Sequence, residues 1–219
     1  MSKTLALLHT TPVTVGAMSE LAARELPGVR VINLLDDSLL KDVIAAGGVT
    51  AAVEARMRAY FEQARVAGAD AVLCCCSSVG DVVDRARAEA PIPLLRIDEP
   101  MAVEAVQSGR RIGVIATVRT TLEPTVGLIR RKAQELGRAV DVEPVLVQGA
   151  FDALSAGDGA AHDRLVKEAL IALLKRSDVV VLAQASIARV LAALEQPPAI
   201  PVLTSPLSGL KAAGAILAE

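Results

Sequence analysis

ADAVLCCCSSVGD, residues 69–81, is the stretch that decides the fold. An apolar run of strand length ends in cysteines and meets two serines and a glycine, which is typical of a buried parallel strand that turns into a helix. All three cysteines of the chain, Cys74, Cys75 and Cys76, lie here. Adjacent cysteines form no ordinary disulfide framework and lack the spacing and histidines of a zinc site. We therefore expect no metal and a reducing, cytoplasmic compartment.

The same alternation of short apolar runs and helix-period segments extends along the whole chain and predicts an α/β protein. Placing Thr10 on Thr117 gives an offset of 107, and placing Asp70 on Asp178 gives an offset of 108. Four strand candidates are thus followed by four similar ones. The candidate strands are residues 4–10, 29–34, 70–75 and 92–97, then 111–117, 141–147, 178–183 and 200–205.

This repeat predicts two similar flavodoxin-like or Rossmann-like parallel-sheet domains related by an approximate twofold, with the active site in the cleft between them. The C-terminal segment is expected to return to the first domain. The predicted domains are residues 1–98 plus 206–219, and residues 99–205.

The composition of the chain excludes several classes of function. Hydrophobic residues make up 53% of the 219-residue chain, but aromatic residues only 1%, and the net charge is -2. Such a chain has neither stacking platforms nor a basic surface for nucleic acid. The apolar run near the N-terminus is too short for a signal peptide or a membrane span. We expect a cytoplasmic protein that binds a small molecule, with no nucleic acid or membrane as partner.

Hydroxyl residues follow the predicted strands where helices begin. In doubly wound sheets, ligands bind beyond the carboxyl ends of the strands. Helix N-termini with free N–H groups favour an anion there, so a small carboxylate is the expected ligand. The alternative is that these residues are ordinary helix caps. The predicted caps are Thr11 before Pro12, Ser78 with Asp81, Thr120 with Glu123, and Ser186.

Cys76 is the candidate reactive group because it is the last residue of its predicted strand. A thiol beside a helix N-terminus is expected to have a lowered pKa and to act as acid, base or nucleophile. Cys74 and Cys75 lie deeper in the strand and are interpreted as small buried hydrophobic residues.

The segment GADAVLCCCSS resembles the first catalytic-cysteine motif of the aspartate/glutamate/hydantoin racemase superfamily, in which the cysteine follows an aspartate by six residues; Cys76 matches it. GVIATVRTT is similar to the carboxylate-binding strand and threonines of the family's second domain, which match Thr117, Thr120 and Thr121. The resemblance covers nearly the whole chain. It implies racemisation without a cofactor, by two cysteines on opposite sides of a cleft, and a homo-oligomer of two or more copies.

The chain departs from the family at the second cysteine, where Gln184 stands six residues after Asp178. Glutamine exchanges no proton near neutral pH, although it can donate a hydrogen bond to an enolate oxygen. Three interpretations stay open. His9 is a candidate second acid/base; Cys76 alone could serve a decarboxylation or isomerisation; or the chain binds carboxylates without catalysis.

The leading prediction is a racemase or isomerase-type enzyme that moves a proton at the carbon next to a carboxylate, with a lyase (decarboxylase) or a binding protein as alternatives. His162 and Asp163 resemble a recurring family feature, but acidic residues are common at helix starts, so they stay outside the predicted site. Asp98 and Glu99 are expected in a solvated loop. The predicted catalytic residues are Cys76, His9 and Gln184, and the predicted substrate-binding residues are Thr10, Thr11, Ser77, Ser78, Thr117, Thr120, Thr121 and Ser186.

Overall fold

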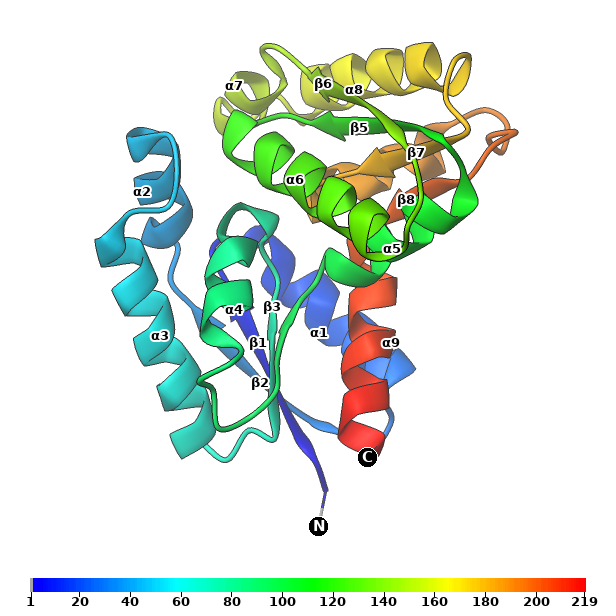
Figure 1. Ribbon diagram of the computed structural model, residues 1–219. Coiled ribbons are helices and arrows are strands. Elements are labelled where there is room, and N and C mark those ends of the chain that lie inside the picture. The colour runs from blue at the N-terminus through cyan, green and yellow to red at the C-terminus, as the bar shows by residue number, and fades with distance from the viewer. Residues whose placement is uncertain (1) are drawn as a thin grey trace. The chain divides into compact units, whose positions relative to one another are not determined.

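The computed structural model describes residues 2–219, which divide into two compact units (Figure 1). The first unit runs to Pro100 and includes Pro206–Glu219, and the second is Met101–Ser205. The boundary expected after residue 98 thus lies two residues further on. The expected twofold and the cleft between the domains stay predictions.

A four-stranded parallel sheet in the order β2-β1-β3-β4 forms the centre of the first unit. Leu5 and Leu7 of β1 pack with α1 and α9 on one face, and the alternate residues Ala6 and Leu8 pack with α2, α3 and α4 on the other. The elements are β1 (Thr4–His9), α1 (Val13–Glu25), β2 (Arg30–Leu35), α2 (Ser38–Ala46), α3 (Ala51–Val66), β3 (Ala71–Cys74), the 3₁₀ turn η1 (Ser77–Val79), α4 (Gly80–Ala86), β4 (Leu94–Arg96) and α9 (Ser205–Ala218).

The second unit repeats this plan with the order β6-β5-β7-β8, again all parallel. Val114 of β5 packs with α5 and α6, whereas Ile115 packs with α8 on the other face. Figure 1 shows α6 and α8 on opposite faces of this sheet. The elements are α5 (Glu99–Ser108), β5 (Arg111–Ala116), α6 (Arg119–Glu135), β6 (Asp141–Leu146), α7 (Ala150–Ser155), α8 (Gly159–Leu174), β7 (Val179–Leu182), the 3₁₀ segment η2 (Ala185–Ala193) and β8 (Val202–Thr204).

The predicted fold class is confirmed. All eight strands form within two residues of their expected ends, and the strands of the two sheets follow the same order. The internal repeat extends to individual hydrogen bonds. Asp70 accepts a hydrogen bond from the backbone N–H of Thr4 at 2.7 Å, and its counterpart Asp178 accepts one from Arg111 at 2.8 Å. The two aspartates therefore fix the start of the central strand of each sheet.

None of the four predicted hydroxyl caps forms as expected. Ser78 lies within η1, Thr120 in the first turn of α6, and Ser186 in η2, and none of these elements has a side-chain cap. The N-cap of α1 is Pro12, and this helix has no side-chain cap either. The Thr11 hydroxyl accepts only a long hydrogen bond, 3.4 Å, from the N–H of Val13.

The cause lies at the strand ends. Cys76, Val118 and Gln184 keep the extended backbone of the preceding strand and themselves occupy the N-cap positions, so the hydroxyl residues fall one or more places too late to cap. These N-termini thus lack side-chain caps, so their first backbone N–H groups can donate to another acceptor, such as an anion. Within residues 2–219, no helix is both long and apolar enough to cross a membrane.

Candidate active site

Cys76 and Thr10 lie together at the carboxyl edge of the first sheet. Leu8 of β1 pairs with Cys74 of β3, so the residues two places further along each strand are neighbours on the same face. The Thr10 hydroxyl is buried and makes no hydrogen bond of acceptable geometry within residues 2–219. It is close enough to the Cys76 thiol to influence the pKa of that thiol, and we take it as an available donor.

Cys76 differs from the other two thiols in its exposure. Cys74 and Cys75 are buried on opposite faces of the first sheet, and Cys76 keeps part of its surface exposed. Burial raises the pKa of the Cys74 thiol to about 12 and that of Cys75 well above its ordinary value. Of the three, only Cys76 is placed to meet a ligand.

The expectation of a lowered Cys76 pKa is wrong. Burial raises the pKa of this thiol, and the Thr10 hydroxyl and the amide and hydroxyl of Ser78 oppose the rise without cancelling it. The element that follows Cys76 is a three-residue 3₁₀ turn, too short for the sizeable dipole of a long helix. The protonated thiol therefore predominates at neutral pH, which suits Cys76 to donate a proton.

Thr10→Val is expected to raise the pKa of Cys76 further, because it removes a hydroxyl that stabilises the thiolate. Alkylation by iodoacetamide should follow the thiolate, so its midpoint should lie above that of free cysteine, about 8.5, and move to still higher pH in the variant. Cys76→Ser measures background labelling of the buried thiols, and Thr11→Val is the matched control. An unchanged or lower midpoint in Thr10→Val would contradict this assignment.

Ser77 and Ser78 are both buried directly after Cys76, and Ser78 contacts its thiol. The structure thus brings Thr10, Cys76 and Ser78 together, with Ser77 next in the chain. Thr11 is half-buried and is tied to the start of α1.

His9 is fully buried at the end of β1, and both of its ring nitrogens are occupied. Nε2 lies 3.0 Å from Asn33 Oδ1, and Nδ1 lies 2.9 Å from Thr14 Oγ1. An amide oxygen only accepts, so Nε2 carries a hydrogen, and Nδ1 contacts the Thr14 hydroxyl, which also lies 3.3 Å from the Thr11 carbonyl as its donor. Burial lowers the pKa of His9, against the hydrogen bond to Asn33. Neither nitrogen is free for a substrate proton, and we leave His9 out of the acid/base pair proposed below.

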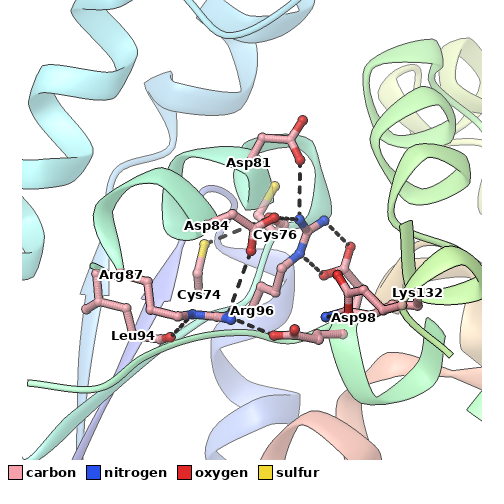
Figure 2. A network of polar contacts seen from close by, with 11 residues as sticks. Cys74, Cys76, Asp81, Asp84, Arg87, Leu94, Arg96, Asp98 and Lys132 are labelled. Carbon is pink, nitrogen blue, oxygen red and sulfur yellow. Dashed lines mark hydrogen bonds and ion pairs between the residues drawn. The ribbon is translucent and has the colours of Figure 1, made fainter. Parts of the chain in front are cut away.

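Arg96 is a residue that the sequence analysis missed. It is 1% exposed, and its Nε and Nη2 donate to the two carboxylate oxygens of Asp98, at 2.7 and 3.0 Å. Its Nη1 donates to Asp84 at 2.5 Å and to Asp81 at 3.3 Å (Figure 2). Asp98 is 0% exposed and Glu99 is the first residue of α5, so the solvated loop expected for both residues is wrong. A charge inside a predicted buried strand was the available signal, since such charges require partners.

The Arg96 cluster supports the loop that carries Cys76. Gly80, the first residue of α4, lies so close to the guanidinium that a Cβ there would be 2.5 Å from Arg96 Cζ. The chain therefore passes from Cys76 into α4 directly over a buried cation, and Figure 2 shows Cys76 beside this network. Asp98 also raises the pKa of the Cys76 thiol, although less than burial does.

In the second unit, Thr117 and Gln184 occupy the places that Thr10 and Cys76 occupy in the first. Ile115 of β5 pairs with Leu182 of β7, and the residues two places beyond are again neighbours. Gln184 Oε1 accepts from the Thr117 backbone N–H at 2.6 Å and from its hydroxyl at 2.9 Å. The Gln184 amide nitrogen donates to no group within residues 2–219 and stays available for a ligand.

The remaining predicted residues of this unit lie near the same edge. The Thr120 hydroxyl, in the first turn of α6, is buried without a hydrogen-bond partner among the described residues, and Thr121 is buried beside it in the chain. Ser186 is half-buried in η2. Each unit thus carries its own set of polar groups at its strand ends. No cluster of three or more potential metal-ligating side chains occurs in the described part of the chain.

Solved structures with this fold include several racemases. A glutamate racemase from Bacillus anthracis has a TM-score of 0.72 at 19% identity, with 99% of this chain and 82% of that chain covered. An allantoin racemase from Klebsiella pneumoniae has a TM-score of 0.68 at 21% identity, with 99% and 88% covered. The aspartate racemase of Picrophilus torridus has a TM-score of 0.71 at 12% identity, with 97% and 94% covered. At these identities, the likeness shows the fold.

The family is shown by sequence. No curated protein sequence matches this chain significantly. The model of the Asp/Glu/hydantoin racemase family, in contrast, matches residues 9–213. The chain belongs to the Asp/Glu/hydantoin racemase family.

Proposed function

We propose that this protein is a cofactor-independent racemase or isomerase-type enzyme that moves a proton at the carbon next to the carboxylate of a small acid. Cys76 is the proton carrier of the first unit. The observation that carries the proposal is the position of Cys76: a partly exposed thiol at a strand end, between the hydroxyls of Thr10 and Ser78. The family membership supports a racemase-type reaction.

The polar groups of the second unit suit a carboxylate and the enolate that forms when its α proton leaves. The Gln184 amide nitrogen and the buried Thr120 hydroxyl are donors without partners among residues 2–219. The N–H groups at the start of α6 have no side-chain cap. Donors aimed at developing negative charge stabilise it more than they stabilise the neutral substrate. We assign Thr117, Thr120, Thr121 and Gln184 to substrate binding on this basis.

The test is proton exchange in deuterated water. The structural neighbours are named for glutamate, aspartate and allantoin, so both enantiomers of each are the first probes. We expect deuterium at the α carbon and loss of optical activity with at least one of them or a related small acid. An absence of exchange across a broad panel of carboxylates and hydantoins would overturn the proposal.

A decarboxylase is the second candidate, and Gln184 is the observation that favours it. The second unit has an amide where the first has a thiol, and decarboxylation needs a proton on one face only. The same experiment separates the two functions. Stoichiometric carbon dioxide from a malonate-type acid supports the lyase, and exchange without carbon dioxide supports the racemase. Binding without either would indicate a carboxylate-binding protein.

A further inference from the structure

His162 is a buried histidine with one unoccupied nitrogen. Its side chain is 0% exposed, and Nδ1 lies 2.7 Å from Asp163 Oδ1. Nε2 is also buried but has no hydrogen-bond partner within residues 2–219. Buried polar atoms are almost always paired, and leaving one unpaired costs about 1–3 kcal/mol. A buried Nε2 without a partner among the described residues therefore points to a group that arrives with a ligand.

Asp163 and Arg189 fix the protonation pattern of this ring. At 2.7 Å a carboxylate oxygen can only accept, so Nδ1 of His162 carries a hydrogen, and in the uncharged ring the lone pair is then on Nε2. Arg189 of η2 donates to Asp163 through Nε and Nη2, at 3.0 and 2.8 Å. This arrangement is that of an oriented base, in which a carboxylate sets the tautomer of an imidazole.

The fold places His162 at the same edge of the second sheet as Thr117 and Gln184. The helix α8 lies between β6 and β7, which run parallel, so its first turn is at the carboxyl ends of the strands. Val166, one turn after His162, packs with Ile115 and Leu182. Thr117 and Gln184 are two residues beyond these on the same face. One helical turn spans nearly the same rise as two strand residues, so His162 is level with them.

The internal repeat sets this histidine apart from the other buried positions of α8. The buried positions of α3 are Val53, Met57, Phe61 and Ala64, and those of α8 are His162, Val166, Leu170 and Leu173, each 109 residues later. Three of the four pairs are apolar in both units. Only at the position of Val53 does the second unit have a polar side chain. The unit that lacks the thiol is thus the one that gained an imidazole.

We infer that His162 is the second acid/base of the proposed reaction and takes the role that Gln184 cannot fill. This inference rests on the proposed function. The C–H bond at the α carbon breaks, its proton goes to Nε2 directly or through one water, and the electron pair passes into the enolate. The S–H bond of Cys76 then breaks and its proton forms the new C–H bond of the product. Imidazolium and thiolate remain, and they are the pair needed for the reverse reaction.

Access to Nε2 is expected through η2, which carries Arg189. A nine-residue 3₁₀ segment is unusually long, and its hydrogen bonds have poorer geometry than those of an α-helix. Opening of this segment would cost the packing of Ile187 and Val190, which are buried with Ile115 and Leu182 of the sheet. Asp163 and Arg189 are positioning residues in this scheme, because they act on the ring and not on the substrate.

The first test needs no substrate. The chain has two histidines, so nitrogen spectra of protein labelled with ¹⁵N-histidine contain two rings, which the His162→Gln variant assigns. We expect opposite tautomers at neutral pH: hydrogen on Nδ1 in His162 and on Nε2 in His9. Hydrogen on Nε2 of His162 would overturn the inference and leave the proposed function of Cys76 intact.

The second test uses whichever enantiomeric pair is turned over. In deuterated water, His162→Gln should lower racemisation at least about 100-fold, while exchange at the α carbon of one enantiomer continues through Cys76. In Cys76→Ser, exchange at the α carbon of the opposite enantiomer should continue through His162. Arg164→Gln, on the exposed face of α8, is the matched control and should retain both reactions. Racemisation unchanged in His162→Gln, or both exchange reactions lost together, would show a structural role only.

Discussion

Replacing Cys76 by alanine is expected to lower turnover by about 10²–10⁴-fold, the usual contribution of one positioned acid or base. Cys76 is the only one of the three cysteines that is not buried, and the raised pKa keeps its thiol protonated near neutral pH. Alanine has no proton to give. The rate of α-hydrogen exchange or racemisation, measured at saturating substrate, is the quantity to compare with the unmodified protein.

The matched control is Cys75→Ala, in the adjacent position of the same segment. Cys75 is buried on the opposite face of the sheet, among residues of α1 and α9, and has no path to a ligand at the strand ends. This variant should lose some stability, because it removes buried volume, but keep its rate. If Cys76→Ala kept more than a tenth of the activity, Cys76 would not be the proton carrier.

The fold was predictable because its strands are buried on both faces. Such strands are continuous apolar runs, and these appear in the sequence directly, even for the three-residue strands β4 and β8. The helix caps were not predictable from the sequence, because their positions depend on how far each strand continues. At Cys76 and Gln184 the extended backbone occupies the cap itself, and one or two residues decide the outcome.

Several residues of the candidate site could be predicted from their types and positions, but the electrostatic effects of their surroundings could not. Cys76 and Thr10 follow from their places at strand ends, whereas the direction of the Cys76 pKa shift depends on burial that no local pattern encodes. Arg96 lies in an otherwise apolar segment, IPLLRI, and two of its carboxylate partners are 12 and 15 residues away in the sequence. His162 was visible, but only the structure shows that Nε2 is buried and unpaired.

Arg96→Met is expected to destabilise the first unit by about 3–5 kcal/mol, the usual result of removing one partner of a buried ion pair. The carboxylate of Asp98 is fully buried, and both of its oxygens accept hydrogen bonds from Arg96. Without the guanidinium, this charge has to be neutralised by protonation or exposed by local opening. Urea unfolding at neutral pH, followed by circular dichroism, should show a transition at a clearly lower midpoint.

The control for this prediction is Arg176→Met, the same substitution at an exposed pair. Arg176 donates to both oxygens of Glu143, but both side chains are about half exposed, and exposed pairs contribute little. Its effect should be much smaller. A destabilisation by Arg96→Met no larger than that of Arg176→Met would contradict the importance of burial here.

A double variant separates the two contributions of Arg96. Combining Arg96→Met with Asp98→Leu removes both charges, and replacing a whole buried ion pair by apolar residues is often neutral. We expect it to recover much of the lost stability. Arg96 also packs against Gly80, just after the Cys76 loop, so the double variant should refold without the cation that fixes this loop. Recovered stability with slow turnover would then show that the Arg96 cluster positions Cys76 as well as stabilising the unit, whereas recovery of both would limit its role to stability.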